Sequence, residues 1–225
     1  MKSHRHRAGF CTAHGLSLSA WFDIPTSHLG SGMPPSFVMP PKRMPGKSSS
    51  KVEPPLDGGC ACGAVRYRLH DLPMFVHCCH CTRCQRETGG PFAHHAMIEF
   101  SKFSVLQGEP EFVLVPTDSG GKHWVARCPT CQSAMWNEHG TKAAITRYVR
   151  VGTLDTPGAL PPQAHIFTRS KQPWLVLPDD IPSYRAYYDT SKTWPAESLE
   201  RYKVAKSARA AQAKASRAGT KTRAS

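Results

Sequence analysis

The chain has 225 residues, of which 40% are hydrophobic, and its formal net charge is +13 at neutral pH. This length allows one domain of ordinary size with flanking segments. No apolar run approaches the roughly 20 residues that a membrane-spanning helix needs, and there is no collagen-type glycine repeat. Membrane-spanning helical proteins and collagen-like proteins are therefore excluded as classes.

The positive charge is concentrated at the two ends of the chain. Residues 1–56 hold seven basic and two acidic side chains, and residues 191–225 hold nine basic and two acidic ones. Residues 57–190 hold thirteen basic and twelve acidic side chains, so this part is nearly neutral. We therefore divide the chain into an N-terminal extension (1–56), a central domain (57–190) and a basic C-terminal tail (191–225).

The N-terminal extension is rich in Pro and Ser and poor in apolar residues. Such a composition cannot offset the entropy cost of ordering, so we predict that the extension is disordered. Its basic start is followed by a stretch that His14, Ser17 and Ser19 interrupt, which does not fit a secretory signal. We therefore expect a cytoplasmic protein.

The C-terminal tail is rich in Ala, Lys and Arg, and we predict that it contains a helix from Pro195 to about Gly219. Pro195 suits the first turn of a helix, and Glu197 complements the positive end of its dipole. We favour a solvated helix that aids solubility. The alternative is a tether to nucleic acid or to an anionic surface.

The central domain is predicted to be mainly β, because short segments of alternating apolar and polar residues are separated by turn residues. In Ala64–His70, for example, Val65, Tyr67 and Leu69 share one face. The predicted strands are Ala64–His70, Met74–Cys78, His94–Phe100, Glu111–Val115, His123–Arg127, Ala144–Val151, His165–Arg169 and Trp174–Leu177. One short helix is expected over Arg83–Thr88. This pattern favours a single sandwich or tent of strands over a wound α/β fold.

Eight of the nine cysteines lie in the central domain in three clusters, and Cys11 lies alone in the N-terminal extension. The clusters are Cys60 and Cys62; Cys78, Cys79, Cys81 and Cys84; and Cys128 and Cys131. Disulfides are one interpretation, but they are rare in a reducing compartment. Thiols that are one to three positions apart can instead surround a single tetrahedral zinc ion. The spacing therefore favours metal binding.

Two different zinc sites follow from these clusters. Cys60, Cys62, Cys128 and Cys131 supply the four thiolates of a structural site that joins segments about 70 residues apart. Cys79, Cys81 and Cys84 supply three ligands, which is the arrangement of a catalytic zinc with an open position. A closed structural site with His77 or Cys78 as fourth ligand is the alternative. His80 is not counted as a ligand.

Several motifs resemble those of the glutathione-dependent formaldehyde-activating enzyme (GFA) family, which also includes centromere protein V. The opening motif is Gly58-Gly59-Cys60-Ala61-Cys62-Gly63-Ala64-Val65-Arg66-Tyr67. The second motif starts at Cys79-His80-Cys81-Thr82-Arg83-Cys84, and the third is Cys128-Pro129-Thr130-Cys131. The closing segment of the family resembles Gly152-Thr153-Leu154-Asp155, His165-Ile166, Trp174 and Ile181-Pro182. The resemblance covers about residues 57–187. One departure is Gln132, where many members have Gly.

The resemblance implies a mostly β fold with two zinc ions, one structural and one at the active site, on the cysteines already assigned. It also implies a carbon–sulfur lyase that joins glutathione and formaldehyde into S-hydroxymethylglutathione. Arg83 and Arg86 are candidate anchors for the carboxylates of such a thiol. His165 is either a proton carrier or a hydrogen-bonded core residue.

The alternative function is a non-catalytic, zinc-stapled binding module. Its basic tails would then hold nucleic acid or a cytoskeletal polymer. Aromatic residues are not interleaved with the C-terminal charges, which is unfavourable for a reader of stacked bases. The enzyme is therefore the preferred interpretation, with a small thiol as partner and no membrane.

Overall fold

The structure of the protein, a computed structural model, describes residues 52–116, 121–140 and 145–221, with side chains described as far as Gln212. Most of the expected N-terminal extension lies outside the described residues, together with Cys11, Ala144 and the end of the C-terminal tail.

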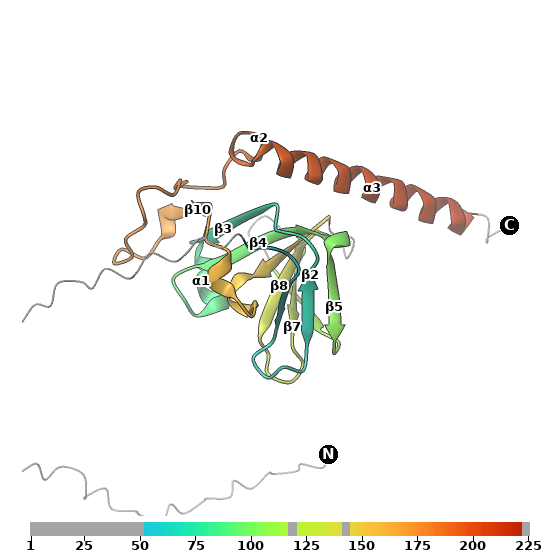
Figure 1. Cartoon of the computed structure of the whole chain (residues 1–225), viewed down its shortest axis with the longest axis horizontal. Coiled ribbons are helices and arrows are strands. Elements are labelled where there is room, and N and C mark those ends of the chain that lie inside the picture. The colour runs from blue at the N-terminus through green and yellow to red at the C-terminus, as the bar shows by residue number, and fades with distance from the viewer. Residues whose placement is uncertain (1–51, 117–120, 141–144, 222–225) are drawn as a thin grey trace, which may run out of the picture. The chain divides into compact units, whose positions relative to one another are not determined.

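Two β-sheets dominate the described residues (Figure 1). The three-stranded sheet has the order β1 (Leu56–Gly59), β2 (Arg66–Leu69), β5 (Phe103–Gln107) and is antiparallel. The seven-stranded sheet has the order β10 (Ala164–Ile166), β3 (Phe75–Cys79), β4 (Ala93–Glu99), β9 (Thr146–Arg150), β8 (Ala134–His139), β7 (His123–Arg127), β6 (Glu111–Val115). Only the pair of β10 and β3 is parallel among these described strands.

The helices of the described part are few and mostly short. They are α1 (Thr82–Thr88), α2 (Thr190–Thr193), α3 (Ala196–Lys221) and the 3₁₀ turns Phe100–Lys102, Val151–Thr153, Pro157–Ala159 and Thr168–Ser170. The thiol of Cys81 caps α1 by accepting a hydrogen bond from the amide of Cys84, and Gly89 ends the helix in a left-handed conformation. The Cys-x-x-Cys spacing of Cys81 and Cys84 thus also provides the N-terminal cap of α1.

The main core lies between the two sheets and is centred on three aromatic rings. Tyr67 of β2 stacks on Phe103 of β5 at 5.2 Å, and Phe103 meets Trp136 of β8 at 4.8 Å between ring centroids. Tyr67 and Trp136 are fully buried. Aromatic pairs at these distances add about 1 kcal/mol each beyond the burial of their apolar area. These aromatic contacts therefore stabilise the packing of the two sheets against each other.

A second core covers the opposite face of the seven-stranded sheet. Successive side chains of β3 point to opposite faces, so Val76 enters the main core while Phe75 and Cys79 enter the second core. The rings of Tyr188 and Trp194, which come from the C-terminal segment, pack against Phe75 at 5.3 and 5.7 Å. All five residues of β3 are buried as a result.

Helix α3 is attached to this second core near its N-terminal end. The buried hydroxyl of Ser198 donates to the carbonyl of Met74, and Arg201 forms two hydrogen bonds of 2.7 Å with the carboxylate of Glu99 on β4. Leu199 and Tyr202 pack against the same apolar cluster. The predicted helix is therefore present, and its first turns pack against the β domain.

The mainly β prediction is confirmed, and so are the strands at Glu111–Val115 and His123–Arg127 with their bounds. The strand predicted over Trp174–Leu177 is wrong. Trp174 and Val176 are 67% and 89% exposed, and the prolines before and after the segment remove backbone donors that a ladder needs. The strand predicted over His165–Arg169 ends early, because Phe167 adopts a left-handed conformation.

Three strands were missed: β1, β5 and β8. β1 contains Gly58 and Gly59, which are not typical of strands. A Cβ on Gly58 would lie 2.5 Å from the Tyr67 hydroxyl, so the close approach of β2 requires glycine there. No helix within the described residues is long and apolar enough to cross a membrane.

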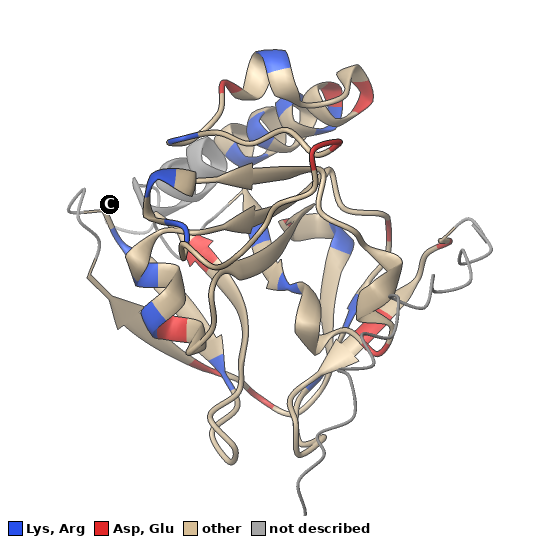
Figure 2. Cartoon of the chain, turned by 90° about the vertical axis from the view of Figure 1, so that its left-hand side faces the viewer, with Lys and Arg blue, Asp and Glu red and all other residues tan. Residues whose placement is uncertain are grey.

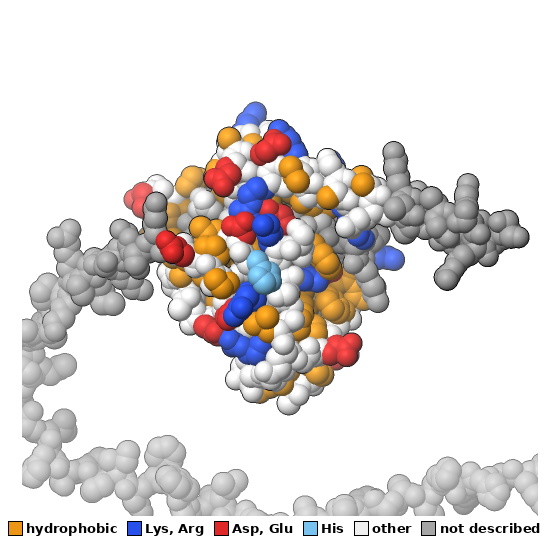
Figure 3. All heavy atoms as spheres, turned by 45° about the vertical axis from the view of Figure 1, so that its right-hand side comes forward, with side chains coloured by type: hydrophobic (Ala, Val, Ile, Leu, Met, Phe, Trp, Pro, Cys, Tyr) orange, Lys and Arg blue, Asp and Glu red, His pale blue; other side chains and the backbone are white. Residues whose placement is uncertain are grey.

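Charged residues of both signs are interspersed along the described part of the chain (Figure 2). Many of them are paired, as in Arg68 with Asp57 at 2.6 Å and Lys102 with Asp71 at 3.7 Å. On one face of the molecule, positive and negative side chains lie next to each other around a histidine (Figure 3). The nearly neutral net charge of the central domain thus also reflects pairing of opposite charges between neighbouring side chains.

The attachment of α3 is testable with Arg201→Ala. Glu99, which is 5% exposed, would lose its charged partner, so we expect the free energy of unfolding to fall by about 2 kcal/mol in chemical denaturation. The control is Lys203→Ala, because the pair of Lys203 with Glu200 is exposed and contributes less than about 0.5 kcal/mol. Equal small losses in both variants would contradict the docking of α3.

Candidate metal centres and their cavity

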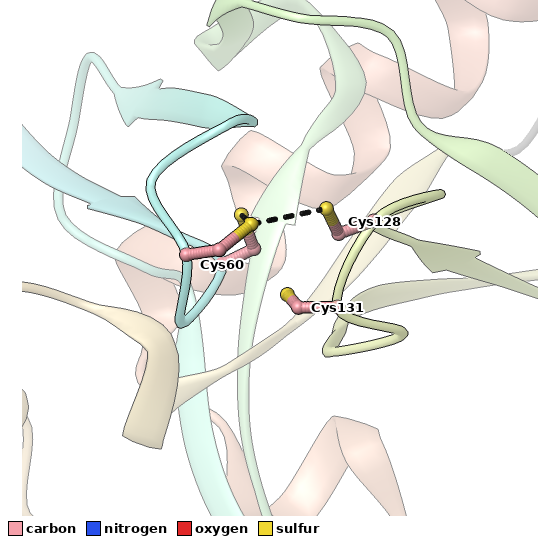
Figure 4. A group of neighbouring side chains, drawn as sticks. Cys60, Cys128 and Cys131 are labelled. Atoms are coloured by element: carbon pink, nitrogen blue, oxygen red, sulfur yellow. Dashed lines mark hydrogen bonds between the residues drawn. The ribbon is translucent and has the colours of Figure 1, made fainter.

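The first cysteine group joins the two sheets. Cys60 and Cys62 lie in the turn between β1 and β2, and Cys128 and Cys131 lie in the turn between β7 and β8. Their sulfur atoms all lie within 4.8 Å of one another. Figure 4 shows Cys60 on one of these turns facing Cys128 and Cys131 on the other. Segments that are 66 residues apart thus meet at one point.

The first turn is folded by hydrogen bonds to Cys60. Its amide donates to the carbonyl of Val65, its carbonyl accepts from the amide of Gly63, and its sulfur accepts from the amide of Val65 at 3.2 Å. Gly63 has a φ of 77°, which favours glycine. The short Cys-Ala-Cys-Gly run therefore brings both thiols to the same side of the turn.

The second turn has a similar design around Cys128. Its amide donates to the carbonyl of Ser133, and its carbonyl accepts from the amide of Gln132 at 2.9 Å. Gln132 has a φ of 60°, a left-handed backbone conformation that favours glycine. Its side-chain amide donates to the carbonyl of Pro129. The turn is thus retained despite the departure at Gln132.

The geometry of this group fits a zinc ion. Tetrahedral zinc with Zn–S bonds of about 2.3 Å requires sulfur atoms about 3.8 Å apart. The sulfur of Cys62 lies 3.5 Å from that of Cys60 and 3.7 Å from that of Cys128. The hydroxyl and amide of Ser133 lower the pKa of Cys131 to about 5, which favours the thiolate that a metal binds.

The second group consists of Cys79, Cys81 and Cys84, whose sulfur atoms also lie within 4.8 Å of one another. Cys79 ends β3, Cys81 caps α1 and Cys84 lies in its first turn. Cys79 and Cys81 raise the pKa of Cys84 far above its usual range, because hydrogen bonds and like charge favour its protonated form. Three thiolates at this spacing therefore need a cation between them, as at a metal site.

The two alternative ligands do not join this group. Cys78 is buried on the opposite face of β3, because side chains alternate along a strand. His77 lies on the same face as Cys79, but its Nδ1 is 3.1 Å from the hydroxyl of Tyr188. Among the described residues, the group thus has three thiols and an open side.

A cavity of about 700 Å³ lies on that open side. Its walls combine the three thiols with imidazoles, aromatic and aliphatic groups, hydroxyls and two guanidinium groups. The lining residues are His77, Cys79, Cys81, Thr82, Arg83, Cys84, His95, His123, His139, Tyr148, Ile166, Phe167, Arg169, Ser170 and Tyr187. Cavities of this size can hold a small molecule such as a tripeptide.

Of the two predicted arginines, Arg83 lines the cavity and Arg86 does not. Arg86 instead borders a shallower depression beside Trp174. Arg169, which sequence reasoning missed, is the second guanidinium of the cavity. It follows Phe167, whose φ of 54° is rare for an aromatic residue and turns the chain sharply after β10.

His165 does not line the cavity. It is 4% exposed, and its Nδ1 lies 3.0 Å from the Nε2 of His80, which is also buried. Burial lowers the pKa of His165 below its usual value. The geometry therefore favours the hydrogen-bonded core interpretation of His165 over the proton carrier.

Four histidines line the cavity, and the sequence analysis considered only His77 among them, as an alternative metal ligand. Burial lowers the pKa of His77 to about 3 and that of His123 to about 4, so both imidazoles are neutral at physiological pH. His95 is shifted in the same direction for the same reason. These residues come from three strands, β3, β4 and β7, and the fourth, His139, comes from β8.

Ion pairs connect the two cysteine groups. The largely buried carboxylate of Glu87 in α1 lies 3.0 Å from Arg150 and 3.7 Å from Arg127. Arg127 also donates to the carbonyl of Gln132 in the Cys128 turn. Arg150 donates to Asn137, whose amide lies 3.4 Å from the Nε2 of His95. Helix α1 is thus tied to the other cysteine group and to the cavity wall.

The family model of the glutathione-dependent formaldehyde-activating enzymes matches residues 55–170 of the chain. The chain belongs to this family. The match includes every cysteine of both groups and most of the residues that line the cavity. It begins two residues before the span expected from the motifs and ends before Trp174.

Two further comparisons add little to the GFA assignment. A crystal structure of a Rhodobacter sphaeroides protein is similar over 57% of this chain and 98% of its own, with 21% identity and a TM-score of 0.35. No curated protein matches the chain. The family assignment therefore rests on the sequence match.

The backbone conformation of Gln132 is testable with Gln132→Gly. Glycine adopts a φ of 60° without steric cost, so we expect the free energy of unfolding to rise by up to about 1 kcal/mol. Gln132→Ala is the control, because it also removes the side-chain hydrogen bond to Pro129 but keeps the strain. Thermal and chemical denaturation measure both. A glycine variant less stable than the alanine variant would contradict this account.

Proposed function

We propose that the protein is a zinc-dependent enzyme of the carbon–sulfur lyase type that acts on an adduct of a thiol and an aldehyde, such as S-hydroxymethylglutathione. The observation that carries this proposal is the group of three thiols that opens onto a large cavity. Three protein thiolates and one free position are typical of a catalytic zinc site. The family match supports the same class of reaction.

Each cysteine group has its own role in this proposal. Cys79, Cys81 and Cys84 hold the active-site zinc, which when bound offers a position for a substrate thiol and lowers the pKa of that thiol. Cys60, Cys62, Cys128 and Cys131 hold a structural zinc at the junction of the two sheets. The free thiols of the described residues suit a reducing compartment such as the cytoplasm.

The remaining cavity residues bind and orient the substrate. Glutathione carries two carboxylates, and Arg83 and Arg169 offer guanidinium groups that can pair with them. Tyr148, Tyr187 and Phe167 supply apolar walls that displace water from the reacting atoms. In this proposal the arginines bind the carboxylates of the substrate and the aromatic walls contact its apolar part. Its thiol is thereby held at the cysteine group.

The alternative function, a module tethered by basic tails, stays a prediction. Its N-terminal part lies outside the described residues, as do the side chains after Gln212. A gel shift over a range of salt concentrations, with and without residues 191–225, tests it directly. Binding that survives the truncation would contradict a tether through the C-terminal tail.

Metal analysis tests the two-site assignment. Purified protein should contain close to two zinc ions per chain, and Cys81→Ser should contain one while it stays folded. The matched control is Cys78→Ser, because Cys78 is a buried neighbour outside the group and its variant should keep both ions. One zinc ion in the parent protein, or equal losses in the two variants, would contradict the assignment.

The reaction itself is testable by NMR exchange between formaldehyde and glutathione. The protein should accelerate the exchange above the uncatalysed rate, which is already fast and must be measured in parallel. Cys81→Ser should return the rate to that background, because it removes the thiol-binding position. Cys78→Ser should remain active. If the parent protein shows only the background rate, the proposed activity is contradicted, whereas the description of the fold is not.

A further inference from the structure

His123 combines burial, a place on the cavity wall and a free ring nitrogen. It begins β7, is 5% exposed and lines the cavity that the three thiols share. Its Nε2 is buried and has no hydrogen-bond partner in the described part of the chain. Buried polar atoms are nearly always hydrogen-bonded, so an unpartnered one beside a cavity indicates a ligand contact.

The ring of His123 is also held in place. It meets the ring of His139 edge to face at 4.4 Å, and His139 in turn meets Tyr148 at 4.8 Å between centroids. Burial, together with His139, Arg83 and Arg150, lowers the pKa of His123 to about 4, although Cys81 opposes the shift. The imidazole is therefore neutral at physiological pH and offers one N–H group.

Two other histidines of the cavity have ring nitrogens that are already engaged. Nδ1 of His77 lies 3.1 Å from the hydroxyl of Tyr188, and Nε2 of His95 lies 3.4 Å from the amide of Asn137. His139 is exposed. Within the described residues, His123 is thus the cavity-lining histidine with a buried ring nitrogen that has no hydrogen-bond partner.

We propose that His123 is a catalytic residue that donates a hydrogen bond from Nε2 to the oxygen of the aldehyde and of the hydroxymethyl adduct. This inference rests on the proposed function. When the adduct forms, the thiol loses its proton to water, the sulfur–carbon bond forms, and the carbonyl π electrons move to oxygen. Water then protonates that oxygen. The reverse reaction breaks the sulfur–carbon bond and returns both protons.

The contribution of His123 is greatest when the oxygen carries negative charge. A fixed donor in a site that excludes water stabilises such an oxyanion more than it stabilises the neutral carbonyl. A neutral imidazole suits this role because its proton is not lost to the substrate. The proposal therefore predicts an effect on the rate of the chemical step more than on substrate binding.

The decisive variant is His123→Phe, which keeps a ring against His139 and removes the donor. We expect kcat for glutathione–formaldehyde exchange to fall about 100-fold, with KM changed less than about threefold and two zinc ions retained. The control is His94→Phe. Nε2 of His94 is also buried without a partner, and its pKa is also lowered to about 4, but His94 does not line the cavity.

One further readout does not depend on that rate, and a second variant tests the role of the donor. In the zinc-loaded protein, addition of glutathione with formaldehyde should shift the ring ¹⁵N signal of His123 and leave that of His94 unchanged. His123→Gln, which restores an N–H donor, should recover part of the lost kcat. A ring signal that does not respond to the adduct would overturn the proposal, and so would equal losses in His123→Phe and His94→Phe.

The experiment also separates this proposal from the function on which it rests. If the parent protein does not accelerate the exchange, the proposed function fails, and the role of His123 fails with it. If the parent accelerates the exchange and His123→Phe does so equally, only the role of His123 is overturned.

Discussion

The arrangement of the whole domain depends on the meeting of two short turns, one from each sheet. Cys60 and Cys62 of the three-stranded sheet and Cys128 and Cys131 of the seven-stranded sheet bring four sulfur atoms within 4.8 Å. Like-charged thiolates at that distance repel unless a cation lies between them. A metal ion bound between them would remove this repulsion and would hold the two sheets together around the aromatic core that they share.

Buried charges connect the second cysteine group to this junction of the two sheets. Glu87 of α1 pairs with Arg127, which precedes Cys128, and with Arg150, which reaches the cavity wall through Asn137. Buried charges keep a defined position because each one is costly to leave unpaired. The position of α1, and of the thiols that it carries, is therefore set by the same region that joins the sheets. The cavity and the junction of the two sheets thus share one network of charged side chains.

The sequence was informative where a few neighbouring residues decide the structure. The spacing of Cys79, Cys81 and Cys84 predicted their meeting because a strand end and a helix cap bring them together locally. Strand patterning failed where packing overrides propensity, as in β1, whose glycines are required by the closeness of Tyr67. It also failed over Trp174–Leu177, where exposed side chains and flanking prolines leave no partner strand.

What the sequence alone determined is the family, the mainly β class and the two sets of thiols, because these follow from short motifs and local periodicity. Only the tertiary structure decided which other residues surround the thiols. His123 and Arg169 lie more than 35 residues from Cys84 in the chain, and nothing in their own neighbourhoods distinguishes them from solvent-exposed or core residues. Strand pairing brings them to one cavity, since the order of a sheet is set by long-range packing that no short motif encodes.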